Sequence, residues 1–219
     1  MSTEVNLLDR YPRSDRPVKE RAGAKTPEQM RVARQFGRDY FDGDRLFGYG
    51  GYHYHPRFWT DTVKRFKGHY HLAENASVLD VGCGKGFMMR DFKTLMPGMT
   101  VAGLDISSYA FEHALEDMKP FIKIGNAKKL PYPDHSFDLV ISIHTIHNLP
   151  PDECGQALRE IQRVTKKNAF VAVDAWRTEE EKARLLQWNL TALTYMHVNE
   201  WKKFFEDAGY QGDYYWFIP

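Results

Sequence analysis

The nine residues Val78-Leu79-Asp80-Val81-Gly82-Cys83-Gly84-Lys85-Gly86 decide the fold of this chain. An apolar run typical of a buried β-strand leads directly into three glycines spaced two residues apart, and apolar residues at helical spacing follow. Glycines at such a junction permit a tight turn and let a ligand approach bare backbone. A dinucleotide-binding loop would read G-x-G-x-x-G, whereas the third glycine here comes one position early. The Asp80 carboxylate would repel a phosphate and suits a cationic group.

Around this stretch, short β-branched runs alternate with helical stretches. The runs that predict strands are SVLDVG (77–82), TVAGLD (100–105), FIKIG (121–125), FDLVISIH (137–144) and AFVAVDA (169–175). Helices are expected between them, on the apolar spacings that include Phe92 and Leu95, then Phe111, Leu115 and Met118, then Leu158, Ile161 and Val164. Strands that alternate with helices in this way predict a doubly wound α/β fold, with a mostly parallel sheet and helices on both faces.

The flanking segments have a different character. Residues 1–25 are polar, charged and interrupted by Pro and Gly, which predicts a flexible or draped arm. A capping box at Thr26 begins a helix expected to end near Gly43, a glycine/aromatic loop spans residues 41–55, and a second helix covers about 56–70. Near the C-terminus, Thr178 begins a helix with an expected apolar stripe. That stripe comprises Ala183, Leu186, Leu190 and Leu193.

Composition excludes several classes of protein. The 219 residues carry 30 Lys and Arg against 29 Asp and Glu, a net charge of +1, so no strong field favours nucleic acid. The longest uninterrupted apolar run, residues 169–173, is far too short to cross a membrane. Two cysteines provide no disulfide framework and suit a reducing compartment. We therefore expect a cytoplasmic protein that binds neither nucleic acid nor a membrane, and a homo-oligomer is compatible with the sequence.

Polar residues stand where each later strand ends. Asp105 closes the second strand, where an acid can accept both hydroxyls of a ribose or can serve simple turn chemistry. Asn126 follows the third strand, placed either to bond an adenine edge or to cap a helix, and Ala127 leaves room for a ring. His144 ends the fourth strand. Because parallel strands end at one edge of the sheet, we expect these residues to line one ligand site.

Four stretches together resemble the class I S-adenosylmethionine-dependent methyltransferases, of the small-molecule type related to the ubiquinone-biosynthesis enzymes. They are VLDVGCGKG, GLDIS, GNAKKLPYPDHSFDLVIS and LREIQRVTKKNAFVAVDAW, within residues 77–176. The resemblance implies a Rossmann-like sheet over residues 72–219, S-adenosylmethionine as cofactor, and a helical lid over residues 26–71. It places the cofactor against Asp80, Gly82, Cys83, Gly84, Gly86, Asp105, Ile106, Asn126, Ala127 and His144.

Two features depart from the family pattern. The family often has Asp where Asn126 stands, so the exocyclic amine of adenine would have to be met by the side-chain carbonyl. The family sheet usually closes with an antiparallel hairpin, but only ten residues follow Gly209. We therefore expect the last strand to be missing or built differently.

Methyl transfer needs mainly alignment of a nucleophile and exclusion of water. His144 and His147 are the candidate bases, Asp174 could orient an amine or a base, and packing or capping roles remain open for His147 and Asp174. Candidate substrate contacts are Tyr49, Tyr52, His53, Tyr54 and Trp176, and ordinary packing on the core remains open as the role of the aromatic rings of the loop. The histidines lack an acidic cluster in sequence, and the transfer needs no Lewis acid, so no metal is expected.

The sequence thus predicts an S-adenosylmethionine-dependent methyltransferase acting on oxygen or nitrogen of a small-molecule metabolite. Three alternatives stay open. A non-catalytic module would bind the same cofactor without turnover, and a non-methylating enzyme would use it for different chemistry. A nicotinamide-dependent oxidoreductase would need the longer glycine spacing.

Overall fold

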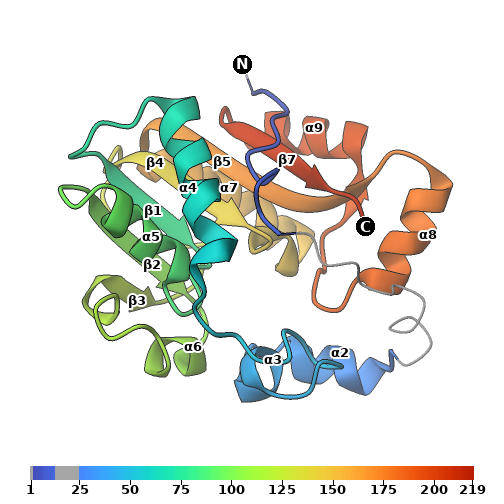
Figure 1. Ribbon diagram of the computed structural model, residues 1–219. Helices are drawn as coiled ribbons and strands as arrows, with labels where there is room; N and C mark the ends of the chain where they lie inside the picture. The colour runs from blue at the N-terminus through green and yellow to red at the C-terminus, as the bar shows by residue number, and fades with distance from the viewer. Residues whose placement is uncertain (1, 13–24) are drawn as a thin grey trace.

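The structure of the chain, a computed structural model, describes residues 2–12 and 25–219 (Figure 1). Its sheet has the order β3-β2-β1-β4-β5, and both β6 and β7 pair with β5. Every one of these pairings is parallel. The strands are β1 (Ser77–Val81), β2 (Thr100–Asp105), β3 (Ile122–Ile124), β4 (Phe137–Ile143), β5 (Thr165–Trp176), β6 (Met196–His197) and β7 (Asp213–Phe217).

Helices cover both faces of the sheet (Figure 1). The helices are α2 (Pro27–Ala33), α3 (Arg38–Asp42), α4 (Pro56–Tyr70), α5 (Phe87–Leu95), α6 (Ser108–Glu112), α7 (Pro151–Val164), α8 (Glu179–Trp188) and α9 (Val198–Asp207), with 3-10 turns η1 (Lys119–Phe121) and η2 (Ile146–Asn148). Side chains alternate along each strand, so Val78 packs into the apolar layer under α4 and α5 and Leu79 into the layer under α7 and α9. Burial on both faces explains why the strands read as apolar runs and confirms the doubly wound α/β fold.

Three expectations about elements were wrong in detail. The helix expected from Thr26 to Gly43 is two short helices, α2 and α3, separated around Phe36, whose φ is 49°. The stripe expected in α8 is also wrong, because Leu186 is 46% exposed whereas Leu185 is fully buried. The helix expected through Met118 ends at Glu112, and turns follow it.

The last strand is built differently from the family hairpin. β7 lies parallel to β5, with Phe170 opposite Asp213 and Asp174 opposite Phe217. The far edge of β7 pairs with the N-terminal segment, in which the Val5 N–H donates to the Tyr214 carbonyl at 2.9 Å. The sheet edge is therefore completed from the other end of the chain.

The N-terminal segment, residues 2–12, is packed rather than free. Leu7 is fully buried in the layer that holds Val63 and Phe66 of α4. The rest of the expected arm, residues 1 and 13–24, lies outside the described residues. Among the described residues, no helix is both long enough and apolar enough for a membrane span.

Candidate functional site

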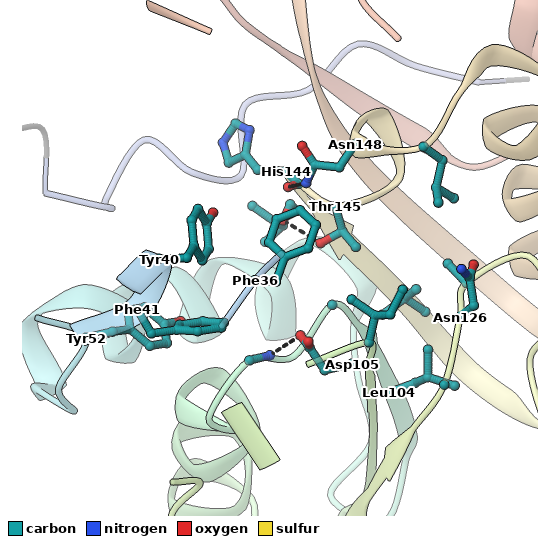
Figure 2. A pocket seen from close by; sticks show the side chains of 18 of the residues that line it. Phe36, Tyr40, Phe41, Tyr52, Leu104, Asp105, Asn126, His144, Thr145 and Asn148 are labelled. Atoms are coloured by element: carbon teal, nitrogen blue, oxygen red, sulfur yellow. Dashed lines mark hydrogen bonds between the residues drawn. The ribbon is translucent and has the colours of Figure 1, made fainter. Parts of the chain in front are cut away.

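A pocket opens at the carboxyl ends of β1, β2 and β4 (Figure 2). Its floor comes from the loops that follow these strands and β3, and its roof comes from α3 and the loop after it. The lining residues are Phe36, Tyr40, Phe41, Tyr49, Tyr52, Val81, Gly82, Gly84, Leu104, Asp105, Ile106, Gly125, Asn126, Ala127, Ile143, His144, Thr145, Asn148 and Leu149. The topology therefore brings four predicted strand ends together at one edge of the sheet.

Two glycines of the glycine loop have positive φ and lie against side chains that line the pocket. Gly82 has φ of 89°, and a Cβ there would overlap the Thr145 side chain from the loop after β4. Gly84 has φ of 53°, and the ring of Tyr52 lies directly against it. The Gly84 N–H donates to Asp105 Oδ2 at 2.7 Å, so the loop is tied to the end of β2.

Two buried carboxylates stand beside this loop. Asp80 is 5% exposed and Asp105 is 8% exposed. Burial and the nearby Asp105 carboxylate raise the pKa of Asp80 to about 8. Burial also raises the pKa of Asp105, against the backbone N–H groups of Ser107 and Gly84 that bond it. A cationic ligand would relieve this repulsion, whereas a phosphate would add to it.

Aromatic rings form the roof of the pocket. We call residues 36–52 the covering segment. The rings of Tyr49 and Tyr52 have centroids 4.4 Å apart, and Tyr52 stacks on Phe87 of α5 at 4.6 Å. Figure 2 shows Phe36, Tyr40 and Phe41 from this segment facing the loops that carry Asp105 and His144. The pocket thus has an aromatic roof above a floor that carries both polar and apolar side chains.

Polar bonds fasten the covering segment to the floor. The Asp42 carboxylate accepts bonds from Lys85 Nζ at 2.6 Å, from the Tyr109 hydroxyl at 2.8 Å and from the Tyr52 N–H at 2.9 Å. Partial burial opposes ionisation of Asp42, yet the Lys85 ammonium and the Tyr52 N–H bring its pKa to about 2. The Ser107 hydroxyl donates to the Phe36 carbonyl at 2.5 Å. The loops after β1 and β2 therefore both hold the roof.

A second polar group lies where β4 and β5 end. His144 Nδ1 is 3.5 Å from Asp174 Oδ1, and the ring of His144 packs edge-on against Phe217 of β7 with centroids 5.0 Å apart. His144 lines the pocket and has φ of 53°. Burial opposes ionisation of Asp174, but His147 and His144 beside it lower its pKa. This arrangement orients a histidine at the pocket wall through a carboxylate behind it.

His147 lies deeper than His144. It is 4% exposed, and its Nδ1 accepts the Asp174 N–H at 2.9 Å. Burial lowers the pKa of His147 to about 4, so its imidazole is neutral near pH 7. Its carbonyl accepts the N–H groups of Leu193 and Thr194, both at 2.9 Å. Through these bonds His147 connects η2 to β5 and to the loop after α8.

Among the described residues, one group has the donor set of a metal site: His144, His147 and Asp174. The Nδ1 lone pair of His147 is already used by the Asp174 N–H. Neutral imidazole that accepts at Nδ1 carries its proton on Nε2, so neither nitrogen of this ring is ready to bind a cation. The Asp174 N–H thus occupies the Nδ1 atom of His147 that would otherwise be free to bind a cation.

The predicted site residues divide into those on the pocket wall and those outside it. Gly82, Gly84, Asp105, Ile106, Asn126, Ala127, His144, Tyr49 and Tyr52 line the pocket. Asp80 is buried behind the floor, and Gly86, with φ of 81°, precedes α5. The Cys83 side chain packs into the core beside Gly103. His53 is also absent from the pocket lining.

Two aromatic candidates are engaged elsewhere. The Tyr54 hydroxyl donates to Asp91 Oδ1 at 2.5 Å, which fixes the start of α4 against α5. Trp176 is 9% exposed, and the Lys182 ammonium lies 5.4 Å from its ring centre. These contacts give both side chains packing partners away from the pocket lining.

Sequence reasoning missed several lining residues. Phe36 and Tyr40 fall within the helix that the sequence predicts from Thr26 to near Gly43, and Phe41 is the first residue of the expected glycine/aromatic loop. A segment that covers a pocket and a helix face that packs in the core contain the same types of apolar residue. Hydrophobic periodicity alone therefore does not distinguish the two. Thr145 could have been found from the sequence. It follows the expected strand 137–144, and in the fold β4 pairs with β1, the strand that leads into the glycine loop. Lys85 does not line the pocket but holds Asp42 of the covering segment, and its signal in the sequence is that it is the one cation within the glycine loop.

Comparison with known proteins gives consistent matches. A family model described as a methyltransferase domain matches residues 79–173. A protein of Encephalitozoon cuniculi named as a putative methyltransferase is 31% identical over 159 residues, covering 65% of this chain and 71% of that protein. The demethylmenaquinone methyltransferase of Lactiplantibacillus plantarum is 36% identical over 121 residues, covering 52% of this chain and 49% of the enzyme.

A solved structure supports the same fold. The YcgJ protein from Bacillus subtilis matches with a TM-score of 0.54 and 20% identity, covering 67% of this chain and 66% of that one. Among the curated relatives, the chain spans about half the length of the demethylmenaquinone enzyme and 44% of a malonyl-[acyl-carrier protein] O-methyltransferase from Legionella pneumophila.

Proposed function

Given that this chain belongs to the methyltransferase family, we propose that it transfers a methyl group from S-adenosylmethionine to an oxygen or nitrogen of a small-molecule metabolite. The observation that carries the proposal is the pocket itself. A glycine loop flanked by Asp80 and Asp105 opens at the strand ends, beneath an aromatic cover. This combination suits a positively charged nucleoside and disfavours a pyrophosphate.

The pocket residues fit each part of that cofactor. Gly82 and Gly84 offer bare backbone to the methionine portion. Asp80 lies buried behind them, and a sulfonium or ammonium beside it would favour its charged form. Asp105 would accept the ribose hydroxyls. Asn126 and Ala127 would flank the adenine. The covering segment acts in this proposal as the lid that excludes water.

The cofactor, when bound, supplies an electrophilic methyl group on a positively charged sulfur. The residues of the chain then position the acceptor and take its proton. The acceptor hydroxyl or amine lies at the pocket wall beside His144, and its proton passes to Nε2 of that ring. Asp174 faces Nδ1 at 3.5 Å and stabilises the charge that the imidazole gains. Transfer of the methyl group to the acceptor would leave S-adenosylhomocysteine as the second product.

The acceptor class is proposed from the same features. The buried carboxyl groups of Asp80, Asp105 and Asp174 lie around the strand ends, and an anionic group at the acceptor position would make their ionisation still more costly. Aromatic side chains on the covering segment favour a flat or apolar body. The name of the Lactiplantibacillus plantarum relative also points to a small organic acceptor. A neutral metabolite with a hydroxyl or amine fits these conditions.

The test is turnover with a panel of acceptors. The purified chain is incubated with S-adenosylmethionine and neutral phenols, hydroquinones, alcohols and amines, and products are identified by mass spectrometry. We expect S-adenosylhomocysteine to form together with one acceptor heavier by a methylene unit. Cofactor binding without any methylated product would favour a non-catalytic module, and a product that carries another part of the cofactor would reveal different chemistry.

A further inference from the structure

The backbone of His144, just after β4, has a left-handed conformation, with φ of 53°. Side chains alternate along a strand, and Ile141 and Ile143 of β4 face the apolar layer under α4 and α5. A strand continued by one residue would therefore turn the next side chain toward the opposite layer, under α7 and α9. The His144 ring instead contacts Asp174 and Phe217.

Asp174 and Phe217 lie on the first of these two faces. They are register partners in β5 and β7, so their side chains point to the same side of the sheet. Ala172 and Tyr215, two residues earlier in each strand, face the layer under α4 and α5. The left-handed backbone therefore turns the His144 ring back onto the face that carries its carboxylate partner.

Two hydrogen bonds hold the backbone of His144. Its N–H donates to the Ala172 carbonyl at 3.0 Å, and its carbonyl accepts from Asn148 Nδ2 at 3.1 Å (Figure 2). A carbonyl oxygen only accepts, so the arm of the Asn148 amide that makes this bond is the donor arm. Among the described residues, none donates to the buried Asn148 Oδ1. The Asn148 amide is thus held through its donor arm alone.

Asn148 is itself fixed in place. Its N–H donates to the Thr145 carbonyl at 3.0 Å, which closes the turn η2. The next residue, Leu149, accepts the Thr194 hydroxyl at 2.7 Å, so η2 is tied to the loop after α8. Asn148 also lines the pocket. A fixed amide at the pocket wall can therefore impose a conformation on the residue that it bonds.

We propose that Asn148 is a positioning residue for His144, because its Nδ2 holds the His144 carbonyl and with it the left-handed backbone that directs the imidazole toward Asp174. A residue with a Cβ adopts this backbone rarely and keeps it only where its surroundings determine it. Without the bond, the His144 carbonyl turns and the ring leaves Asp174 and Phe217. The consequence for catalysis rests on the proposed function, in which His144 is the base.

Three variants of the full chain separate this role from others. Asn148→Asp keeps the shape of the side chain and replaces the donor by an oxygen, which repels the His144 carbonyl. Asn148→Ala removes the donor without adding charge. Asn199→Asp is the matched control, because Asn199 is exposed at the start of α9 and its variant carries the same change of charge away from the pocket.

Nuclear Overhauser spectroscopy of the ligand-free chain reports the position of the ring directly. The rings of His144 and Phe217 have centroids 5.0 Å apart, so their protons should give cross-peaks in the wild-type chain and in Asn199→Asp. We expect these cross-peaks to disappear in both Asn148 variants. Cross-peaks between the rings of Phe205 and Trp216, stacked in the core at 5.7 Å, should persist and show that the fold is intact.

Turnover gives the second readout. Both Asn148 variants should lower kcat by about tenfold to hundredfold, since a small displacement of a catalytic group costs this much. The Kd of S-adenosylhomocysteine should stay near the wild-type value. In a chain that already carries His144→Ala, Asn148→Asp should lower kcat no further, because the two residues act as one unit.

Cross-peaks between His144 and Phe217 that persist in both Asn148 variants would overturn the inference. A further loss of kcat in the His144→Ala background would overturn it as well, since Asn148 would then act independently of His144. Loss of the cross-peaks together with wild-type turnover would support the positioning role and would overturn the proposed role of His144 as the base.

Discussion

Asp105 joins the two loops that form the pocket floor. Its Oδ2 accepts the Gly84 N–H at 2.7 Å and its Oδ1 accepts the Ser107 N–H at 2.9 Å. Both bonds favour the charged form of the carboxylate, and they hold the loops in position before any ligand arrives. A ribose would therefore meet a carboxylate that is already oriented, so little ordering is required on binding.

The stability of the chain should depend on pH through Asp80, because the pKa of Asp80 is about 8 in the folded chain against an ordinary value of 3.8. Between these values the folded chain binds more protons than the unfolded chain, so stability falls as pH rises through this window. Asp80→Asn removes that loss. We expect the variant to be more stable than wild type by about 1–3 kcal/mol at pH 8, with a smaller difference at pH 5.

Urea denaturation of the ligand-free chain at the two pH values measures this difference. The same variant should bind S-adenosylmethionine more weakly, since it lacks the carboxylate that faces the cation. A variant less stable than wild type at pH 8, or an equal difference at both pH values, would contradict this description of Asp80.

His144 is predicted to matter for turnover and not for cofactor affinity. His144→Ala should lower kcat by about 10²–10⁴-fold, the usual effect of losing a positioned base. Asp174→Asn should lower kcat less, because the histidine remains while its orienting charge is lost. The Kd of S-adenosylhomocysteine, measured by calorimetry, should stay near the wild-type value in His144→Ala. Wild-type turnover in that variant would exclude His144 as the base.

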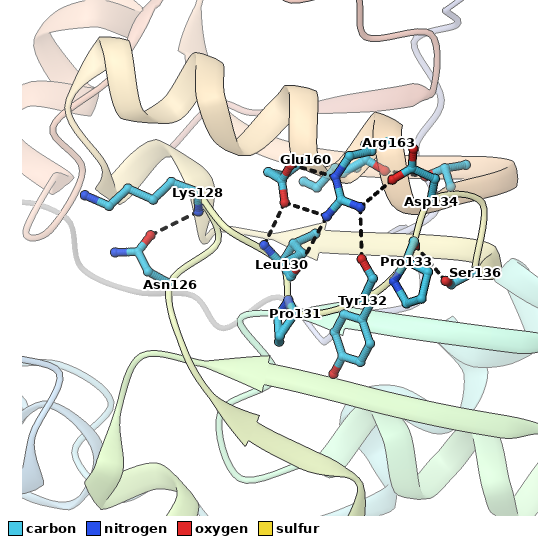
Figure 3. A network of polar contacts seen from close by, with 12 residues as sticks. Asn126, Lys128, Leu130, Pro131, Tyr132, Pro133, Asp134, Ser136, Glu160 and Arg163 are labelled. Carbon is cyan, nitrogen blue, oxygen red and sulfur yellow. Dashed lines mark hydrogen bonds and ion pairs between the residues drawn. The ribbon is translucent and has the colours of Figure 1, made fainter.

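The sequence predicts the residues of the pocket floor better than those of the pocket roof. Gly82, Asp105 and His144 sit at strand ends, a position that the strand pattern itself predicts. Phe36 and Tyr40 reach the pocket through tertiary contacts of the covering segment, and no local pattern encodes these contacts. The orientation of the Asn126 amide also depends on the bond that its Oδ1 accepts from the Lys128 N–H, which only the structure supplies (Figure 3).

At the scale of elements, one largely buried ion pair is among the contacts that fasten the covering segment. The side chains of Lys85 and Asp42 are 6% and 17% exposed, and their charged atoms are 2.6 Å apart. We expect Lys85→Met to free the segment, because the Asp42 carboxylate would lose its ammonium partner. Trypsin cleavage after Arg45, within the covering segment, should then become faster, and S-adenosylhomocysteine should bind about tenfold or more weakly.

Lys64→Met is the matched control, since Lys64 pairs with Asp61 on the exposed surface of α4. That variant should digest and bind like wild type. If Lys85→Met were as resistant to trypsin as the control, the ion pair would not be what fastens the cover. The double variant with Asp42→Asn should be less impaired than the sum of the single variants, because the two side chains act as one unit.

The predicted elements were confirmed where burial on both faces of the sheet imposes an apolar pattern on the strand. They were wrong where hydrogen bonds to distant parts of the chain determine where an element ends. The five main strands and α7 follow apolar periodicity closely. The break between α2 and α3 falls at Phe36, whose carbonyl is bonded by the distant Ser107 hydroxyl. The parallel direction of β7 depends on pairing with β5, and the two residues of β6 are too few to give a sequence signal.

For the whole molecule, the N-terminal segment contributes to stability. Leu7 is fully buried against α4, and the segment pairs with β7 through the bonded pair Val5 and Tyr214. We expect Leu7→Ala to lower the free energy of unfolding by about 2–5 kcal/mol, the range for a leucine removed from a core. Leu46→Ala, at a side chain that is 41% exposed, is the control and should have little effect. Equal midpoints for the two variants in urea would show that the segment is not part of the core.

The shape of the whole molecule places every proposed contact at one edge of the sheet. The helices on both faces bury the apolar layers, and the loops at the carboxyl ends of the strands carry Asp105, Asn126 and His144 (Figures 1 and 2). The proposed function therefore depends on which ligand binds at that edge of the sheet.

Calorimetric titration of the purified chain with S-adenosylhomocysteine and, separately, with NADH tests this claim most directly. We predict saturable binding of S-adenosylhomocysteine that weakens by about 1–3 kcal/mol in Asp105→Ala, and no binding of NADH. Binding of NADH together with no heat from S-adenosylhomocysteine would contradict the account.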